Sequence, residues 1–429
     1  MGNHGSTIDA LLAAVLAEPE DDAARLVYAD ALQAAGDPRG ELVAVQCELA
    51  RLGCGPSDRL FLEWVGDAFA DETALAGGRI AKLRAREAAL LKKHGAAFHA
   101  ACLPRGVAPA RVTFWRGFPE RVAWDLRARV DGGVEAVAAR TPLDYVMPSN
   151  AKSAAELADF LARPALARVR EIYDVHGHGL APYADAPLPG LRRLLLNHTG
   201  GPHELALLRR AKWLPRLTGL VLGGFSLADS AADAAALVAK TPKLEELQLV
   251  DTRIGAAALG ALSLPKTLRV LALRHAKLGP GEIAPLLAEL AASGLAALDL
   301  RTNKLGAADT KALGAGFAAL RVLDLGNNDL PRGALAALAS GEGLGALRSL
   351  GLQKSGVTDA TLATLAKSPL FARLHALDLR KNALTDAAIP ALARAKSLRT
   401  LHVGGNGLTP KGKKALQETR SLASAKLYV

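Results

Sequence analysis

Apolar residues recur with one spacing from residue 191 to the end of the chain, in the form Leu-x-x-Leu-x-Leu-x-x-Asn-x-Leu. The pattern is clean in the copies that begin at Leu295, Leu320 and Leu374. Further copies, in which another residue often replaces Asn, begin at Leu191, Leu217, Leu244, Leu268, Leu347 and Leu398. Successive starts lie 24–27 residues apart, and a half copy over 422–427 follows the ninth. Nine copies in register predict an array of stacked repeats.

Each copy predicts a strand followed by a helix. In the segment x-Leu-x-Leu-x the side chains alternate, so the leucines face the interior and the x residues face solvent. The stretch after Asn, such as AAIPALARA over 387–395, has Leu and Ala at helical spacing. One such unit cannot bury its apolar side alone, whereas stacking encloses each leucine with a gain of roughly 1.5–3 kcal/mol. The Asn amide is both donor and acceptor, so we expect it to satisfy backbone groups of neighbouring turns.

The repeat resembles the ribonuclease-inhibitor-like class of leucine-rich repeats. The form LxxLxLxxNxLTDAAxxALA, seen over 374–393, is similar to bacterial members of that class. The resemblance covers residues 191–429, with nine full copies and a terminal strand. It implies an α/β solenoid, a horseshoe with a parallel sheet on its concave side and helices on its convex side. It also implies that binding takes place on the concave side.

The front of the chain carries a second resemblance. It contains EPEDD over 18–22, RLVYAD over 25–30 and GDPRGE over 36–41, and VTFWRGFPERV follows over 112–122. Together these segments resemble a short bacterial repeat-companion domain found beside repeat arrays in myxobacteria and planctomycetes, although Ala31 stands where Trp is frequent. The resemblance implies a context and no known activity.

Residues 1–104 are predicted to form a small all-α domain. Pro19 and its acidic neighbours start a helix, because carboxylates suit the positive end of the helix dipole. The expected apolar face of this helix consists of Leu26, Val27, Ala29 and Leu32. We expect Asp30, Asp37 and Arg39 to form buried structural pairs, in preference to any catalytic role.

Residues 105–190 are predicted to be a transition region with degenerate capping repeats, because the open end of an array exposes its core. Val112–Trp115 and Arg121–Trp124 have the pattern of short strands around a Gly-Phe-Pro turn. Leu143–Val146 and Leu166–Val169 have the pattern of degenerate repeats. The expected core of the cap consists of Phe114, Trp115, Phe118 and Trp124.

Charge is distributed unevenly along the 429 residues, which carry a net charge of +11. Residues 1–110 hold 11 Lys and Arg against 15 Asp and Glu, a balance of −4, so the remainder holds 42 against 27, a balance of +15. A basic surface favours acidic proteins, nucleic acid or anionic lipid. The other interpretation is that arginine is spread over solvated faces without a binding role.

Motifs of catalysis are missing from the sequence. It has no phosphate-binding Gly-x-x-x-x-Gly-Lys loop, no Gly-x-Ser-x-Gly elbow and no His-Glu-x-x-His pair. His176 and His178 offer only two metal ligands, so we predict no metal, no cofactor and no catalytic residue. Three cysteines without a Cys-x-x-Cys pair favour a reducing, cytoplasmic setting. No apolar run approaches the ~18–20 residues of a membrane span.

The candidate site follows from the alternation of side chains in the predicted strands. Counted from the first Leu of a copy, positions +2, +4 and +6 point out of the concave side of the sheet. In the later copies these positions hold many polar and charged residues. The predicted partner-binding residues are Glu246, Gln248, Arg274, Asp299, Arg301, Asp324, Gln353, Asp378, Arg380 and His402. The alternative is that neighbouring Asp and Arg only neutralise one another across strands.

These patterns favour a non-catalytic adaptor whose concave face binds a protein partner with an acidic surface. Three other functions remain open. The basic repeats could bind nucleic acid, although aromatic stacking residues are few on this face. The chain could regulate an enzyme such as a small GTPase, or it could assemble with copies of itself. The pattern leaves the oligomeric state open.

Overall fold

The computed structural model describes residues 2–55, 78–174, 178–197, 204–227, 231–291, 293–331, 333–340, 342–423 and 425–429. These residues divide into two compact units. Unit 1 comprises the chain up to Leu194 together with Ala211–Trp213, and unit 2 comprises Leu195–Arg210 and Leu214–Val429.

Unit 1 opens with helices, as predicted. They are α1 (Gly2–Ala17), α2 (Asp22–Ala34), α3 (Arg39–Arg51) and α5 (Arg79–Cys102). The start of α2 is set by Asp21, whose carboxylate accepts a hydrogen bond from the backbone N–H of Ala23 at 2.8 Å. Gly36, at a φ of 75°, ends the turn after α2 in a conformation that favours glycine.

The predicted apolar face of α2 is only half right, because Ala29 and Leu32 are buried but Leu26 and Val27 are not. Leu26 is 43% exposed and Val27 is 54% exposed. The buried face instead consists of Arg25, Tyr28, Ala29 and Leu32. The reason is that Arg25 finds a buried acid and backbone carbonyls as partners, which rotates the helix away from the purely apolar choice.

Buried pairing is also wrong for Asp30, whose side chain is exposed. The other two residues of that prediction do pair. Asp37 and Arg39 form a local ion pair at 2.5 Å between Oδ2 and Nη2, with both side chains partly buried. This pair fixes the turn between α2 and α3.

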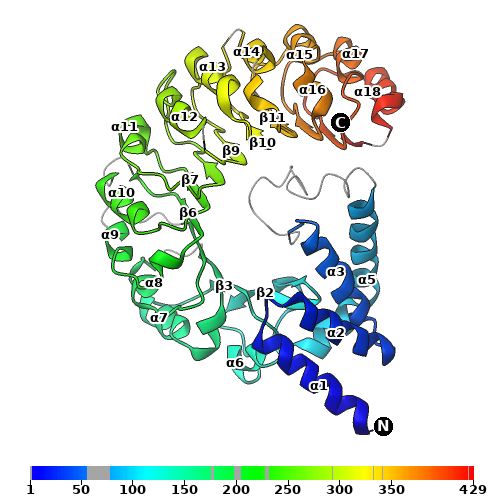
Figure 1. Cartoon of the computed structure of the whole chain (residues 1–429), viewed down its shortest axis with the longest axis vertical. Coiled ribbons are helices and arrows are strands. Elements are labelled where there is room, and N and C mark those ends of the chain that lie inside the picture. The colour runs from blue at the N-terminus through cyan, green and yellow to red at the C-terminus, as the bar shows by residue number, and fades with distance from the viewer. Residues whose placement is uncertain are drawn as a thin grey trace. The chain divides into compact units, whose positions relative to one another are not determined.

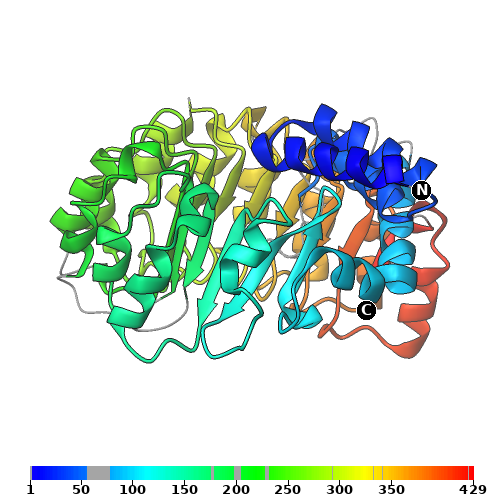
Figure 2. The same ribbon diagram turned by 90° about the horizontal axis from the view of Figure 1, so that it is seen from below.

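The sheet of unit 1 begins with an antiparallel hairpin of β1 (Val112–Trp115), as predicted, and β2 (Phe118–Asp125). The turn lies at Arg116 and Gly117, and Phe118 and Pro119 of the predicted Gly-Phe-Pro turn belong to β2. Parallel pairing starts at β2 and continues through β3 (Tyr145–Ser149) to β4 (Glu171–Asp174). Figure 2 shows these strands side by side in cyan to green. The helices between and after them are α6 (Gly133–Ala138), α7 (Ala154–Leu161) and α8 (Ala181–Asp185).

Region 105–190 therefore contains strand-and-helix turns, as the degenerate pattern predicts. Leu143 lies just before β3, as Leu295 lies just before β9 in a clean copy, whereas Leu166 lies in a 3₁₀ turn further ahead of β4. Phe118 is 2% exposed and Trp124 is 8% exposed, which confirms their expected place in a core. The next strand, β5 (Arg193–Asn197), belongs to the first of the nine leucine copies, which begins at Leu191.

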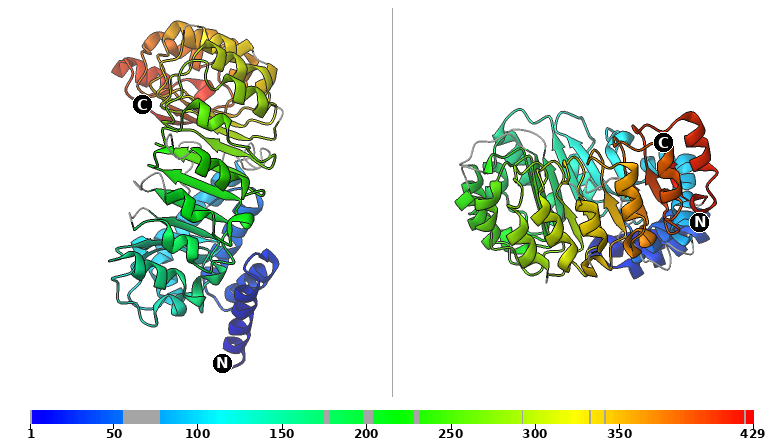
Figure 3. Two further views of the ribbon diagram at one scale, coloured as in Figure 1. Left: turned by 90° about the vertical axis from the view of Figure 1, so that its left-hand side faces the viewer. Right: turned by 90° about the horizontal axis from the view of Figure 1, so that it is seen from above.

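Unit 2 stacks one strand from each copy. The strands are β6 (Gly219–Gly223), β7 (Glu246–Val250), β8 (Val270–Ala272), β9 (Ala297–Asp299), β10 (Val322–Asp324), β11 (Ser349–Gly351), β12 (Ala376–Asp378), β13 (Thr400–His402) and β14 (Lys426–Tyr428). Each pairs in parallel with the next in chain order. Figure 3 shows the green strands of this unit stacked one on the next. The predicted terminal strand is confirmed as β14.

In unit 2 the helices lie together on one side of the sheet (Figure 1). They are α9 (Glu204–Leu208), α10 (Ala231–Ala239), α11 (Gly255–Gly260), α12 (Ala284–Ala291), α13 (Ala307–Gly316), α14 (Ala334–Ser340), α15 (Asp359–Leu365), α16 (Pro369–Arg373), α17 (Ile389–Leu392) and α18 (Pro410–Gln417). The leucines of the pattern fill the space between strands and helices. Leu298, Leu323 and Leu377, for example, are each fully buried.

A ladder of asparagine side chains joins neighbouring copies, as predicted for the Asn position. The Oδ1 of Asn328 accepts a hydrogen bond from the backbone N–H of Asn303 at 3.0 Å. Its Nδ2 donates to the carbonyls of Leu300 at 3.0 Å and Leu325 at 2.9 Å. Asn303, Asn382 and Asn406 make equivalent bonds. The amide thus satisfies backbone groups of two turns at once.

The residue before the ladder position adopts a left-handed backbone in eight copies. Its φ runs from 49° to 75° in Gly224, Asp251, His275, Thr302, Asn327, Lys354, Lys381 and Gly405. For a residue other than glycine this conformation costs roughly 1–2 kcal/mol. Six of the copies therefore hold a strained turn residue at the end of the strand.

We expect Lys354→Gly to raise the free energy of unfolding by about 0.5–1 kcal/mol. The gain is the strain relieved, less the roughly 0.5–1 kcal/mol by which glycine favours the unfolded chain. The midpoint of urea unfolding, at an unchanged slope, measures it. Lys354→Ala is the control, because it removes the same side chain and keeps the Cβ. Equal midpoints for the two variants would contradict the strain argument.

Candidate binding face of unit 2

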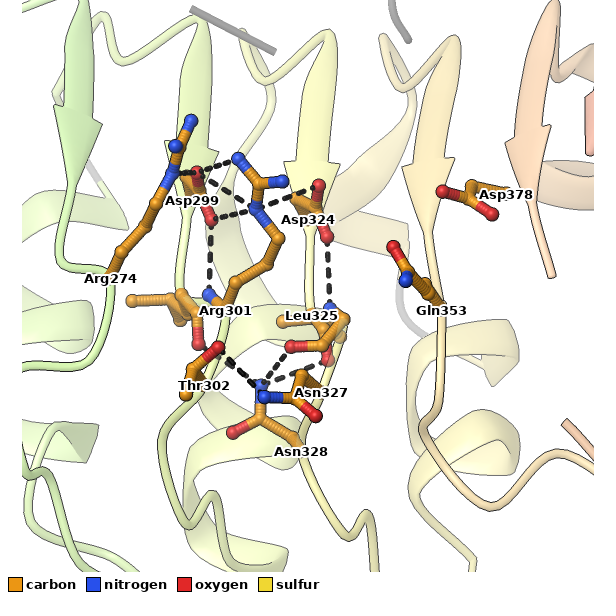
Figure 4. A network of polar contacts seen from close by, with 12 residues as sticks. Arg274, Asp299, Arg301, Thr302, Asp324, Leu325, Asn327, Asn328, Gln353 and Asp378 are labelled. Atoms are coloured by element: carbon orange, nitrogen blue, oxygen red, sulfur yellow. Dashed lines mark hydrogen bonds and ion pairs between the residues drawn. The ribbon is translucent and has the colours of Figure 1, made fainter. Parts of the chain in front are cut away.

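Five of the predicted site residues lie in one row across the strands of unit 2, namely Gln248, Asp299, Asp324, Asp378 and His402, whereas Glu246 lies two residues earlier on β7 and pairs with Gly219 and Val270. The parallel register pairs Val221 with Gln248, and it continues through Ala272, Asp299, Asp324, Gly351, Asp378 and His402 to Tyr428. Figure 4 shows that the side chains of Asp299, Asp324 and Asp378 project to the same side of the sheet. Arg274, Arg301, Gln353 and Arg380 follow two residues later in their copies. The structure therefore brings the predicted residues onto one face.

Arginine side chains cover the aspartates of this row. Asp299 pairs with Arg274 and with Arg301, whose Nη2 lies 2.8 Å from Oδ2. Arg301 also reaches Asp324, with Nε 3.3 Å from Oδ2. Each of these two aspartates is at most 2% exposed. The carboxylates are therefore held beneath the guanidinium groups (Figure 4) and are not accessible to a partner.

A backbone contact fixes the carboxylates as well. Oδ1 of Asp299 accepts from the backbone N–H of Arg301 at 3.0 Å, and Oδ1 of Asp378 accepts from that of Arg380 at the same distance. Asp324 accepts from the N–H of Gly326 at 2.9 Å. The sequence Asp-Leu-Arg or Asp-Leu-Gly thus closes the strand with one repeated turn. Because the carboxylate is anchored, it orients the arginine that follows it.

The guanidinium groups are the reachable part of the row. The side chains of Arg274 and Arg301 are about a quarter exposed, and that of Arg380 is 37% exposed. Arg274 meets Asp299 through Nε, and its terminal nitrogens point away from the carboxylate (Figure 4). Burial works against the charge of Arg301, but its hydrogen bonds with Asp299 raise the pKa above the ordinary value. These groups remain cationic donors at any physiological pH.

Both ends of the row differ from its middle. Near the start, Gln248 is buried and donates to the carboxylate of Glu246. At the end, the His402 ring stacks on Tyr428 with ring centroids 4.2 Å apart, and burial lowers the pKa of His402. Gln353 projects from the face between Asp324 and Asp378 (Figure 4). Sequence reasoning missed Tyr428, because counting from Leu422 places Lys426 at +4, whereas the observed register pairs Lys426 with Thr400 and Tyr428 with His402.

Positive charge exceeds negative charge beside the row and not within it. Three aspartates and three arginines balance in the row itself. The turns that follow the strands hold exposed Lys354 and Lys381, and two positions after the same turn position lie exposed Arg253, Lys277 and Lys304. The acids at the same turn positions are Asp251 and Asp329, and Asp251 is paired with His275 at 2.7 Å. Counting turn positions as well as strand positions along the sequence could have found this excess.

The described residues hold no metal cluster, and the thiols of Cys47 and Cys102 are not activated. Within the described ranges, no cluster of three or more His, Cys, Asp or Glu is placed to hold a metal ion. His176 of the weak two-histidine pattern lies outside those ranges. Burial raises the pKa of Cys47 to about 12 and also raises that of Cys102, so neither thiol is an activated nucleophile. None of the described helices is long and apolar enough to span a membrane.

Parallel strands in chain order, an asparagine ladder and a helix after each strand define a leucine-rich-repeat solenoid of the α/β class. A family model described as "Leucine Rich repeat" matches residues 394–416. A search of curated proteins gave no match.

Three solved structures are similar to the chain. An internalin (InlF) from Listeria monocytogenes is 17% identical, with a TM-score of 0.40, over 72% of this chain and 86% of that one. TLR13 in a complex with ssRNA13 is 19% identical, with a TM-score of 0.39, over 67% and 38%. A protein from Bacteroides fragilis is 14% identical, with a TM-score of 0.35, over 70% and 79%.

Proposed function

We propose that the chain is a non-catalytic cytoplasmic adaptor whose unit 2 binds an acidic segment of a protein partner. The observation that carries the proposal is the row of anchored guanidinium groups beside exposed cationic turns on one face. The buried free thiols of Cys47 and Cys102 support a reducing compartment. The repeat-companion resemblance of the front segments supports a bacterial origin.

The chemistry of the row favours carboxylates. An arginine held by a buried aspartate has little conformational freedom left to lose, so its remaining donors are ready for a planar, two-oxygen partner. The neighbouring lysines add attraction at longer range and speed the encounter with an acidic surface. The aspartates position the arginines and do not touch the partner. The predicted contact residues are therefore Arg274, Arg301, Gln353, Arg380 and His402, with the lysines of the turns added.

Exposed lysines allow a clean test, because their replacement leaves the core intact. We expect a variant with glutamine at Lys277, Lys304, Lys354 and Lys381 to bind a labelled peptide of alternating Glu and Ala about tenfold more weakly than wild type. The control carries glutamine at Lys311, Lys367, Lys411 and Lys413, which are exposed on or beside the helices of unit 2. Both variants change the net charge equally. Fluorescence anisotropy at two salt concentrations gives the affinities, and equal losses in both would defeat the proposal.

A second variant tests the row itself. Arg274→Gln leaves Asp299 paired with Arg301, so the fold should persist while the peptide loses one donor pair. Tighter binding of single-stranded RNA than of the acidic peptide, lost in the first variant only, would favour the nucleic-acid function. A change of nucleotide turnover in a small GTPase, or concentration-dependent mass in sedimentation, would favour enzyme regulation or self-assembly instead.

A further inference from the structure

Unit 1 contains a cleft that the proposed function does not use. Its volume is about 440 Å³, within the range of ligand sites. Leu16, Pro142 and Leu143 contribute to an apolar wall, and four arginines and two carboxylates line the rest. A smaller polar cavity of about 260 Å³ shares Glu20, Arg116, Asp144 and Arg170 with it. We call the larger cavity the unit 1 cleft.

Two of the front segments that resemble the repeat-companion domain meet at this cleft. Glu20 comes from EPEDD, and Arg116 comes from the turn between β1 and β2. Arg25, in the third such segment, lies behind them and donates from Nη1 to the carbonyl of Arg116 at 3.1 Å. Arg170 lies immediately before β4. Segments far apart in the chain thus converge on one set of charged groups.

Glu20 bridges two arginines across the cleft. Its Oε1 lies 3.1 Å from Nη2 of Arg116, and its Oε2 pairs with Nη1 of Arg170. Asp144 holds Arg170 from the other side, with Oδ1 3.3 Å from Nε. Burial opposes the charge of Glu20, but its bonds with Arg170 and Arg116 hold the pKa of its carboxyl below the ordinary value. A single carboxylate is therefore the natural occupant of the space between the two guanidinium groups.

The bridging carboxylate is also the most replaceable member of the cluster. Glu20 is 57% exposed, whereas Arg116 is 12% exposed and Asp144 is 26% exposed. The arginines are held by Asp22, Glu120 and Asp144 even without Glu20. Nε of Arg116 is buried and has no hydrogen-bond partner within the described structure. With four arginines against two carboxylates, the cleft keeps a positive balance of two.

We propose that the unit 1 cleft binds a short acidic peptide whose glutamate carboxylate displaces Glu20 from between Arg116 and Arg170. Glu20 acts as an internal placeholder that lowers the affinity of the free chain. The apolar wall takes the residue next to the glutamate, and the surplus positive charge selects against cationic peptides. This inference does not depend on the face of unit 2.

The test uses the full chain and a fluorescein-labelled Leu-Ala-Pro-Glu amide, which offers one side-chain carboxylate and no free C-terminus. Glu20→Gln is expected to bind it about tenfold more tightly than wild type, because the internal competitor loses its charge. Glu18→Gln is the matched control, since it removes the same charge from an exposed residue of the same loop that does not line the cleft. Arg170→Gln, at a 41% exposed side chain, should abolish the gain in a double variant with Glu20→Gln.

The outcomes separate cleanly. The proposal is supported if the gain appears with Glu20→Gln, is missing with Glu18→Gln and disappears for a peptide with Gln in place of Glu. It is overturned if Glu20→Gln binds no more tightly than wild type, or if the arginine variant retains binding while its tryptophan fluorescence is unchanged. Displacement of the peptide by equimolar inorganic phosphate would also overturn it, because the cleft would then select free anions. The lysine variants of unit 2 should leave these affinities unchanged.

Discussion

Asn328→Ala is expected to lower the free energy of unfolding of unit 2 by about 2–4 kcal/mol. The side chain is 1% exposed and makes hydrogen bonds to backbone groups of two neighbouring copies. Its loss leaves the backbone N–H of Asn303 buried without its acceptor, and an orphaned buried group costs about 1–3 kcal/mol. Losing a bond to a carbonyl that still has another donor costs less. The carbonyl of Leu300, for example, still accepts from the side-chain amide of Asn303. Water cannot substitute in so enclosed a place.

Hydrogen exchange measured by mass spectrometry locates this effect, because exchange should accelerate in the peptides around 297–330 and less elsewhere. Ser355→Ala is the matched control at the same position of the next copy. The Ser355 hydroxyl donates to the carbonyl of Leu325 at 3.1 Å, which Asn328 also serves, and to that of Gln353 at 3.2 Å, but it accepts no backbone N–H as the Asn amide does. We therefore expect a cost of about 0.5–1.5 kcal/mol there. Equal losses of stability at the two positions would show that the Asn side chain contributes no more to the free energy of unfolding than a Ser hydroxyl does.

The repeats of unit 2 could be predicted from sequence because their cause lies inside each copy. Alternation around Leu298, Leu323 and Leu377 sets the strand, the small apolar run after it sets the helix, and the next copy supplies the missing half of the core. The turn of Thr302 could not be predicted in this way. Its φ of 59° is imposed by the ladder on either side, against the preference of a β-branched residue.

Unit 1 was harder to predict because its decisive contacts are distant in sequence. Helical periodicity alone places Leu26 and Val27 inside and Arg25 outside. The structure reverses this choice because Arg25 meets the carbonyl of Arg116, 91 residues later, and the carboxylate of Glu120. A buried arginine is stable only when such partners are in place, and the local sequence pattern cannot predict partners that lie so far along the chain.

For the candidate face, alternation correctly placed Asp299, Asp324 and Asp378 on the same side as their arginines. The alternation could not show how deeply each side chain is buried. The aspartates are buried because each accepts a backbone N–H at the end of its strand and an arginine then folds over it. Both interpretations of the sequence therefore describe part of the face, since the pairs neutralise one another and the arginines still present donors outward.

Arg25→Ala is expected to lower the free energy of unfolding of unit 1 by about 3–5 kcal/mol, the typical cost of removing one partner of a buried ion pair. Arg25 is fully buried, and its Nη2 lies 2.6 Å from Oε1 of Glu120, which is 1% exposed. The same guanidinium donates to the carbonyl of Pro19 at 2.7 Å and lies 5.2 Å from the ring centroid of Phe118. Its removal leaves Glu120 with Arg116 alone, at 3.5 Å.

The pH dependence makes this prediction specific to charge. Burial raises the pKa of Glu120 from 4.5 to about 7, so the folded state holds this proton more tightly than the unfolded chain does. Between those values the unfolded chain has released the proton while the folded chain retains it, and stability falls as pH rises. Relative to Glu120→Gln, the wild type should therefore lose up to about 1.4 kcal/mol for each pH unit in that window.

The two variants combine into one decisive comparison. Arg25→Ala should cost more at pH 8, where Glu120 must carry its charge without Arg25, than at pH 5, where it is protonated in the folded state. Adding Glu120→Gln to Arg25→Ala should recover at least half of the loss at pH 8, because the uncompensated charge is gone. Fluorescence of Trp115, Trp124 and Trp213, which all lie in unit 1, follows the unfolding. A loss independent of pH, or one that Glu120→Gln does not relieve, would mean that Arg25 stabilises unit 1 by packing and carbonyl contacts and not by pairing with a buried acid.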